Sequence, residues 1–489
     1  ELDSAVSVTS QMLTILIQAQ TQDELALLEE DDVLIEPQLE RFGSQQFERS
    51  LEAVEQGRLA ALSASDRIRT LSVSSARYAE FRERVTNRQQ PAPVIRHVQV
   101  TNDSKLAPRL IERRLEDPIG KPLDVSALEA DIADIYGFDT FESVDYRLEA
   151  LPDGASLDIS AREKSWGPNF VRFGVNIEED FSGTNDYNIA ARLTMTELNR
   201  LGGELRFDAQ LGSTTRLFGE WFQPLDYAGR WFVNPSAEVS QIVTPVYEDG
   251  NRVAEFRTRE ALVQMAVGRQ FGNRAEMRLT LSRGYGDSQI ATGDPVFGQS
   301  NVNSAGVLAS VGYDTIDAIA IPRSGTVWNA GFLDSRESLG AEVDFRATVA
   351  TVLKPQTWGR NTLLHWWDFG RTVDAPANSV RPFALGGLFS LSGYARQELN
   401  GRHLGMARML YYRRMTDATI GPFGSTLYLG ASIEAGNVWE NSDDIGFDNM
   451  LTAGSVFLVL DTFAGPLYLA YGEAEGSRSS VYLFLGQTF

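Results

Sequence analysis

Apolar and polar side chains alternate through residues 167–489, and no predicted helical layer follows to cover the apolar ones. In residues 204–211, for example, every second side chain is apolar, beginning with Leu205 and Phe207. A period of two is typical of β-strands that have two different faces. A sheet whose apolar face has nothing to pack against must close on itself and turn that face to lipid. The sequence therefore predicts a mainly β protein, a transmembrane β-barrel.

The composition agrees with this class of protein and argues against others. The chain has no run of about 18 apolar residues, so we expect no transmembrane helix. A net charge of −22 makes nucleic acid an unfavourable partner. Cysteine is absent, which excludes disulfides and thiolate chemistry. His97, His365 and His403 fall on separate predicted elements, so we expect no metal site, and we expect no cofactor.

We count sixteen strand candidates in residues 167–489, from the alternation and the turn residues between them. Turns such as Asn273-Arg274 and Gly421-Pro422 are short. Two connections are predicted to be long, residues 287–301 and residues 373–402. If the first strand rises from the periplasm, both long loops lie on the outside of the cell, as such barrels require.

The alternation also predicts which side chains meet lipid. In the first strand candidate, the lipid-facing residues are expected to be Val171, Phe173, Val175 and Ile177. Aromatic residues form girdles at both membrane–water interfaces. Candidates for these girdles are Trp231, Phe232, Trp366 and Trp367.

Two further segments precede the predicted barrel. Residues 94–164 have the order strand, helix, helix, strand, strand; the strands are predicted at 94–100, 141–148 and 156–162, and the helices at 106–115 and 125–136. Residues 1–88 are predicted to hold amphipathic helices at 6–28 and 47–62 and a short strand at 32–37. These bury little core alone, so we interpret them as the end of a larger α/β domain, with a helical linker as the alternative. Glu1 does not begin a signal peptide, and we expect that more of the protein precedes it.

The second long loop contains Leu391-Ser392-Gly393-Tyr394, and a later strand candidate contains Ser432-Ile433-Glu434-Ala435-Gly436. Alternation turns Leu429 and Ile433 outward, so Glu434 should face the lumen. These segments resemble motifs of the outer-membrane assembly and two-partner secretion superfamily. In that superfamily the loop folds into the barrel through a Val-Arg-Gly-Phe/Tyr motif, and its arginine meets an acidic wall residue. The resemblance predicts a contact between the loop and the wall at Glu434 and Gly436.

Ser392 stands where the superfamily has its arginine. A buried carboxylate without a cation costs several kcal/mol or takes up a proton. Arg396 and Arg402 of the same loop are the candidates to supply the charge. The alternative is that Glu434 is one hydrated lumen carboxylate among many. Further segments resemble superfamily signatures: Tyr313-Asp314 with Pro322 and Gly325, the Gly465-Pro466 strand, and the terminal Phe489, which would be an assembly signal for the barrel-insertion machinery.

Residues 94–164 resemble a POTRA domain, the periplasmic module that precedes barrels of this superfamily. The resemblance rests on the element order and on the junctions Gly120-Lys121-Pro122-Leu123 and Tyr136-Gly137-Phe138. It implies an open strand edge that could bind an extended client segment by β-augmentation. A rigid spacer is the alternative role.

Three segments of the barrel resemble patatin-like lipase autotransporters, the class of type Vd secretion: residues 167–170, 196–202 and 222–226. These proteins join a patatin lipase, one POTRA domain and a sixteen-stranded barrel. Residues 1–85 resemble the end of a patatin domain. The resemblance implies domains at 1–88 (patatin remnant), 94–164 (POTRA) and 167–489 (barrel), the last in the bacterial outer membrane with the first two in the periplasm.

The catalytic residues of patatins are not found in this sequence. No Gly-x-Ser-x-Gly elbow occurs, and Asp153-Gly154-Ala155 matches the Asp motif only in a predicted hairpin turn. We therefore expect a translocation and anchoring portion, with phospholipid acyl-ester hydrolysis carried out by an upstream lipase. Expected partners are outer-membrane lipids, the insertion machinery and the upstream patatin domain; the oligomeric state, monomer or homodimer, stays open.

A rival hypothesis is a transporter or assembly factor for a separate client protein. The patatin-like tail favours the lipase. A diffusive porin is disfavoured by the predicted loop and the predicted POTRA domain.

Overall fold

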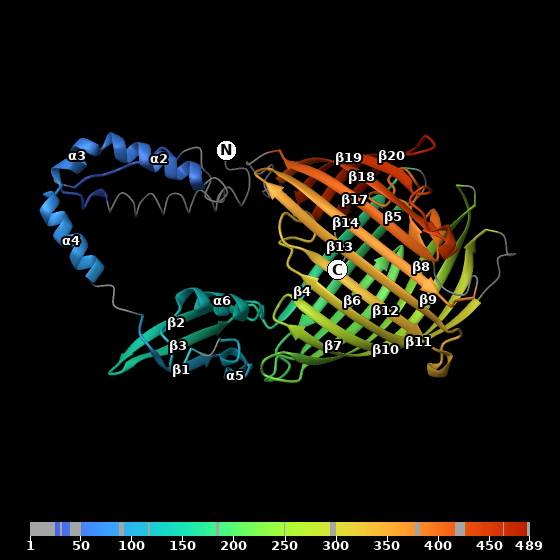
Figure 1. Cartoon of the computed structure of the whole chain (residues 1–489), viewed down its shortest axis with the longest axis horizontal. Coiled ribbons are helices and arrows are strands. Elements are labelled where there is room, and N and C mark those ends of the chain that lie inside the picture. The colour runs from blue at the N-terminus through green and yellow to red at the C-terminus, as the bar shows by residue number, and fades with distance from the viewer. Residues whose placement is uncertain are drawn as a thin grey trace. The chain divides into compact units, whose positions relative to one another are not determined.

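The computed structural model describes residues 25–29, 32–39, 50–87, 92–115, 118–181, 185–248, 250–293, 300–376, 382–415, 426–462 and 464–486. It divides into two compact units, Glu1–Gln90 and Pro91–Phe489. Figure 1 traces the chain through both. The helix predicted at 6–28, the turn at Gly421-Pro422 and the terminal Phe489 lie outside the described residues. No described helix is long and apolar enough to span a bilayer.

The described part of the first unit contains helices and an irregular segment. Its helices are α2 (Ser50–Ser63), α3 (Ser65–Thr70) and α4 (Ser75–Asn87). The strand predicted at 32–37 is wrong: these residues have an irregular backbone. A strand needs a pairing partner for its N–H and C=O groups, and the described part of this unit offers none.

The second unit begins with a small α+β domain. Its elements are β1 (Ile95–Asn102), α5 (Pro108–Glu112), α6 (Val125–Tyr136), β2 (Phe141–Leu151) and β3 (Gly154–Glu163). The predicted element order is therefore present, although α5 is shorter than expected. The sheet has the order β1-β3-β2, with β1 and β3 parallel. The Asp124 side chain caps α6 by accepting the Ala127 N–H at 3.1 Å.

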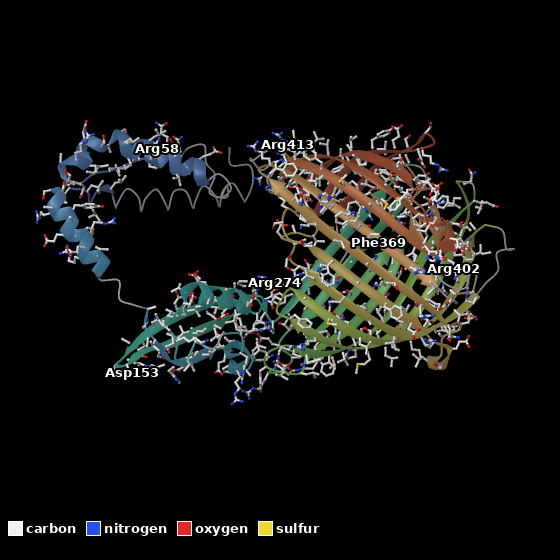
Figure 2. All side chains as sticks on the ribbon, viewed as in Figure 1. Arg58, Asp153, Arg274, Phe369, Arg402 and Arg413 are labelled. Atoms are coloured by element: carbon white, nitrogen blue, oxygen red, sulfur yellow. The ribbon has the colours of Figure 1, made fainter. Side chains whose placement is uncertain are left out.

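The core of this domain comes from the alternating inner positions of the strands and one face of each helix. Its most deeply buried side chains are Ile95, Ile111, Ile135, Phe141, Leu157 and Ile159. Asp153 and Gly154 form the β2–β3 turn, and Asp153 lies at its tip (Figure 2). A Cβ on Gly154 would lie 2.2 Å from the Val94 carbonyl oxygen, so only glycine fits there. The requirements of a hairpin turn thus explain the Asp153-Gly154 pair.

Sixteen strands then close into a barrel, as the alternation predicted. They are β4 (Asn169–Glu179), β5 (Asn185–Met195), β6 (Glu204–Gly212), β7 (Thr214–Pro224), β8 (Trp231–Glu248), β9 (Asn251–Phe271), β10 (Ala275–Thr292), β11 (Ser300–Asp314), β12 (Val327–Ser335), β13 (Phe345–Trp358), β14 (Asn361–Val373), β17 (His403–Arg414), β18 (Thr426–Trp439), β19 (Leu451–Thr462), β20 (Gly465–Ala474) and β21 (Arg478–Gly486). Neighbouring strands pair antiparallel, and β21 closes the ring on β4. Figure 1 shows the tilt of the strands around the barrel.

Two sequence expectations about the wall are wrong. The long connection predicted at 287–301 begins too early, because β10 stays paired with β9 as far as Thr292; β11 then begins at Ser300, and residues 294–299 lie outside the described residues. Phe232 is only 1 % exposed, and Trp366 lies on the lumen side under the Arg408 guanidinium. Adjacent strand residues face opposite sides, so Trp231 and Phe232 cannot share one girdle.

The lipid-facing residues predicted for the first strand are confirmed: Val171 and Phe173 are 59 % and 78 % exposed. The α+β domain packs against one end of the barrel, which we call the domain end. There the Ala107 N–H donates to the Arg200 carbonyl in the β5–β6 turn at 2.9 Å. The Asn273 amide in the β9–β10 turn contacts Asp134 at 3.3 Å. The opposite end, where β14 is joined to β17, is the loop end.

A closed barrel without a free strand edge should resist unfolding by detergent. We predict that the unheated protein migrates faster than the boiled protein in a denaturing gel and shows β-rich circular dichroism. Identical migration before and after boiling, or solubility without detergent, would contradict the barrel.

Candidate functional site in the barrel lumen

The loop between β14 and β17 turns back into the barrel. Two short strands, β15 (Phe383–Leu385) and β16 (Leu399–Gly401), pair at its base. The segment between them carries Leu391 and Ser392, which are both 0 % exposed, and Tyr394, which is 6 % exposed. The sequence motif therefore lies at the most deeply buried part of the loop.

Glu434 on β18 receives this loop. Its Oε2 atom accepts the backbone N–H groups of Leu391 and Ser392, each at 2.8 Å. Its Oε1 atom accepts the hydroxyls of Ser392 at 2.7 Å and Ser432 at 2.6 Å. The side chain is 0 % exposed. The predicted contact between the loop and Glu434 is present, and four donors satisfy the carboxylate.

An unusual backbone makes this arrangement possible. Phe389 and Leu391 have φ values of 59° and 69°, and Gly393 has 109°. Left-handed residues of this kind turn successive N–H groups towards one point, and such concave backbone segments bind anions. The Ser392 hydroxyl also accepts the Phe389 N–H at 3.0 Å. Ser392 thus closes the turn and binds the carboxylate at once.

The two arginines proposed as cation donors do not contact Glu434. Arg396 pairs with Asp186 and lies 3.6 Å from Glu178. Arg402 donates to the Ala375 carbonyl at 2.5 Å. That expectation is wrong because both side chains leave the turn for partners closer to the loop end of the barrel.

Sequence reasoning missed the cation that does lie beside this site, Arg408. It stands directly opposite Glu434 in the β17–β18 register. Its guanidinium donates to the Phe389 carbonyl at 2.6 Å and forms an ion pair with Asp368. It also stacks on Trp366 at 4.0 Å. Alternation along β17 already turns Arg408 inward. That Arg408 stands opposite Glu434 follows only from the pairing register of β17 and β18, which the sequence does not give.

Small residues and one tyrosine complete the contact. The Gly393 N–H donates to the Tyr482 hydroxyl at 2.8 Å. A Cβ on Gly472 of β20 would lie 2.5 Å from the Ser392 Cβ, so the wall needs glycine there for the loop to fit. Gly436, predicted as a partner of the loop, instead makes room for Met406, because its Cβ would lie 2.4 Å from the Met406 sulfur.

A second segment enters the lumen from the domain end. Residues 315–326 join β11 to β12 and bring Ile321, only 9 % exposed, among lumen side chains of the wall. The Tyr412 hydroxyl donates to the Pro322 carbonyl, and the Tyr468 hydroxyl donates to the Ala320 carbonyl at 3.1 Å. We call this segment the inner turn.

The inner turn explains the Pro322 and Gly325 signature. A Cβ on Gly325, whose φ is 92°, would lie 2.0 Å from the Thr315 carbonyl oxygen. Asp317 accepts the N–H groups of Arg323 at 2.8 Å and Ser324 at 3.1 Å. Burial opposes ionisation of Asp317, but these donors outweigh it and hold its pKa below the ordinary value.

The loop and the inner turn meet on one aromatic cluster of the wall. The Phe389 ring from the loop makes edge contacts with Phe457 at 5.0 Å and Tyr468 at 5.9 Å between centroids. Tyr468 also contacts the inner turn. The lumen is therefore filled from both ends against β17 to β21.

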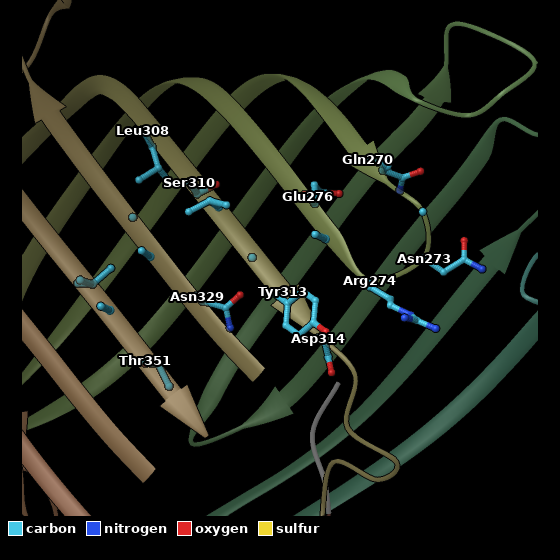
Figure 3. A pocket seen from close by; sticks show the side chains of 18 of the residues that line it. Gln270, Asn273, Arg274, Glu276, Leu308, Ser310, Tyr313, Asp314, Asn329 and Thr351 are labelled. Atoms are coloured by element: carbon cyan, nitrogen blue, oxygen red, sulfur yellow. The ribbon is translucent and has the colours of Figure 1, made fainter. Parts of the chain in front are cut away.

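The opposite wall is open by comparison. A hollow of about 650 Å³ lies against β10 to β13, next to the turn that carries Asn273 and Arg274 (Figure 3). Its lumen-facing lining is small or uncharged over much of its area: Ser310, Gly312, Asn329, Gly331 and Thr351. Within the described ranges, no group of three His, Asp or Glu residues could hold a metal ion.

Solved structures of other proteins share this architecture. Scans against protein-family models and against curated proteins found no match. Among solved structures, BamA from Haemophilus ducreyi lacking POTRA domains 1-3 matches with a TM-score of 0.62 at 12 % identity, covering 81 % of this chain and 85 % of that one. The barrel has the Omp85-type fold.

Two CdiB structures share this fold. CdiB from Escherichia coli matches with a TM-score of 0.55 at 15 % identity, over 81 % of this chain and 77 % of that one. CdiB from Acinetobacter baumannii matches with a TM-score of 0.52 at 12 % identity, over 98 % of both chains. At identities this low, structural similarity shows a common fold and does not show a common activity or common partners.

The close approach at Gly472 gives a direct test of the loop contact. We predict that Gly472→Ala displaces the Ser392 turn, because the new methyl would overlap the Ser392 side chain, and that amide hydrogen exchange in residues 386–398 becomes at least tenfold faster. Gly331→Ala is the matched control, since its methyl would meet only flexible side-chain atoms at 3.3 and 3.5 Å on the open wall. Equal exchange in both variants would contradict the packing.

Proposed function

We propose that this chain is a translocation barrel of the bacterial outer membrane whose lumen is closed at rest by a releasable loop. The observation that carries the proposal is the binding of Glu434 by two backbone N–H groups and two hydroxyls. Hydrogen bonds from neutral donors are weaker than those from an arginine to a carboxylate. A plug held in this way can leave the lumen at moderate cost, which passage of a polypeptide requires.

The α+β domain is assigned as a POTRA domain in the periplasm. Its element order and its position at the domain end support this role. The sheet order β1-β3-β2 leaves β1 and β2 as edges, and an edge strand can bind an extended client segment by β-augmentation. A rigid spacer remains the second role for this domain.

The finer assignment is the barrel and POTRA portion of a patatin-like lipase autotransporter. Two of the sequence segments that suggest this family, residues 196–202 and 222–226, lie where the barrel meets the α+β domain. Glu197 in residues 196–202 is 1 % exposed and accepts the Lys105 N–H at 3.2 Å. Burial raises the pKa of its carboxyl. These segments fix the domain on the barrel rim, which an anchored upstream lipase would need.

The rival function is export or assembly of a separate client protein. The fold shared with BamA and CdiB fits both functions. Residues 1–88 distinguish them, because a dedicated transporter has no use for the end of a lipase domain. Sequencing the gene upstream of the codon for Glu1 decides: a Gly-x-Ser-x-Gly elbow supports the lipase, and an export signal directly followed by residue 1 supports the transporter.

The releasable plug predicts a change in conductance. Replacing residues 388–396 by a short Gly-Ser linker should raise the single-channel conductance in planar bilayers, because Phe389 and Tyr394 no longer fill the lumen. Adding Ile321→Gly should raise it further, since the inner turn fills the other end. Asp443→Asn, in an exposed loop, is the control. Wild-type conductance in the linker variant would show that the loop does not close the pore.

The chain alone should not hydrolyse esters, because neither the nucleophile elbow nor a catalytic Asp is present in its sequence. Asp153 pairs with Arg96 at 3.4 Å on the surface of the hairpin. We predict that a chromogenic acyl ester is turned over no faster by the wild type than by Asp153→Ala. Labelling of any serine by a fluorophosphonate probe would overturn this prediction.

A further inference from the structure

The lipid-facing side of the barrel carries an unbalanced charge at the domain end. On each of the sixteen strands, five residues lie nearest this end. The outward positions among them hold three permanent cations, Arg269 on β9, Lys354 on β13 and Arg413 on β17. They hold no Asp or Glu. All three side chains are exposed. Arg413 is labelled near the end of β17 in Figure 2.

The pairing register confirms that these cations point away from the lumen. Arg269 stands between Trp231 and Met277, which are 46 % and 52 % exposed. Arg413 stands beside Leu429, which is 45 % exposed. Lys354 is three residues beyond Thr351, whose hydroxyl binds the lumen residue Asp368 at 2.7 Å, so Lys354 lies on the other face.

None of the three cations forms an ion pair with another described residue, whereas two cations at the loop end do. There Arg346 pairs with Asp374, and Arg336 pairs with Asp334 at 2.9 Å. Removing a cation from water without a counter-ion is costly. In a bilayer, the counter-ion for an unpaired outward cation must come from the lipid.

The aromatic neighbours set the depth of these cations. The Arg269 guanidinium lies 5.4 Å from the Trp231 ring and 4.9 Å from the Phe271 ring. Tyr411 lies two residues before Arg413 on the same face and is 40 % exposed. Aromatic side chains of this kind gather at the level of the headgroups, and stacking holds a guanidinium there with its N–H groups free.

We propose that Arg269, Lys354 and Arg413 bind the phosphate groups of glycerophospholipids in the leaflet at the domain end, with a preference for anionic headgroups. This inference rests on the proposed membrane location. Each cation contacts a separate lipid, because the three lie on different strands around the wall. Charge complementarity decides the occupant, since a phosphodiester supplies the anion that this face of the protein lacks.

The test uses the full chain in detergent micelles, with retained lipids counted by native mass spectrometry. Wild type should retain phosphatidylglycerol in preference to phosphatidylcholine. Each of Arg269→Gln, Lys354→Gln and Arg413→Gln should weaken phosphatidylglycerol binding at its site by roughly fivefold. The triple variant should retain the two lipids equally.

The matched control removes the same charge from cations nearer the loop end that have partners within the protein, as the triple variant Arg283→Gln, Arg336→Gln and Arg346→Gln. It should retain phosphatidylglycerol as the wild type does. Equal retention by both triple variants would overturn the proposal. So would competition by millimolar inorganic phosphate, because the cations would then bind free phosphate rather than lipid.

Two features keep this test separate from the proposed function. The single variants are measured alongside the triple variant, so that a triple variant that fails to fold does not remove the evidence. Faster migration of unheated samples reports the closed barrel in every variant. A wild type that lacks this behaviour refutes the membrane barrel itself; a folded barrel without a phosphatidylglycerol preference refutes only the lipid sites.

Discussion

A carboxylate buried in a protein wall has to be satisfied by hydrogen-bond donors, and Glu434 finds its donors in the backbone of a loop. Leu391 and Ser392, more than forty residues earlier in the chain, give it their N–H groups. Because a closed barrel turns its polar face inward, its lumen must be filled by water or by polar chain segments. Glu434 selects which segment fills it and fixes the position of that segment.

The rest of the lumen follows from this contact. With Ser392 on Glu434, Phe389 reaches the aromatic cluster that also holds the inner turn. Arg408 then binds the Phe389 carbonyl and balances Asp368, so a cation of the wall also holds the loop. Both segments lie against β17 to β21, and a hollow remains against β10 to β13. Release of one contact would thus loosen the loop without opening the barrel wall.

The sequence predicted the features that depend on the alternation of apolar and polar residues and on sterics. It did not predict the features that depend on which strands and side chains pair. Alternation alone predicted the barrel and the inward direction of Glu434. The same rule, applied to β17 and β14, turns Arg408 and Trp366 inward, but the predictions for these two strands rested on other signals. Arg396 and Arg402 were candidates by proximity in sequence, and only the fold shows that they bind elsewhere. The extension of β10 beyond residue 287 depends mainly on its partner β9, and the pattern of a single strand does not contain that pairing.

Closure of the lumen depends on a charge-assisted contact between Ser392 and Glu434, and a double-mutant cycle measures the strength of that contact. The free energy of loop opening would be measured by amide hydrogen exchange of residues 386–398 in the wild type, in Ser392→Ala, in Glu434→Gln and in the double variant. The expected coupling energy is about 1 to 2 kcal/mol, because Ser392→Ala removes the hydroxyl donor and Glu434→Gln removes the charge on the acceptor of the same hydrogen bond. Additive effects, within about 0.5 kcal/mol, would show that Ser392 and Glu434 act independently and that the loop is held by other contacts.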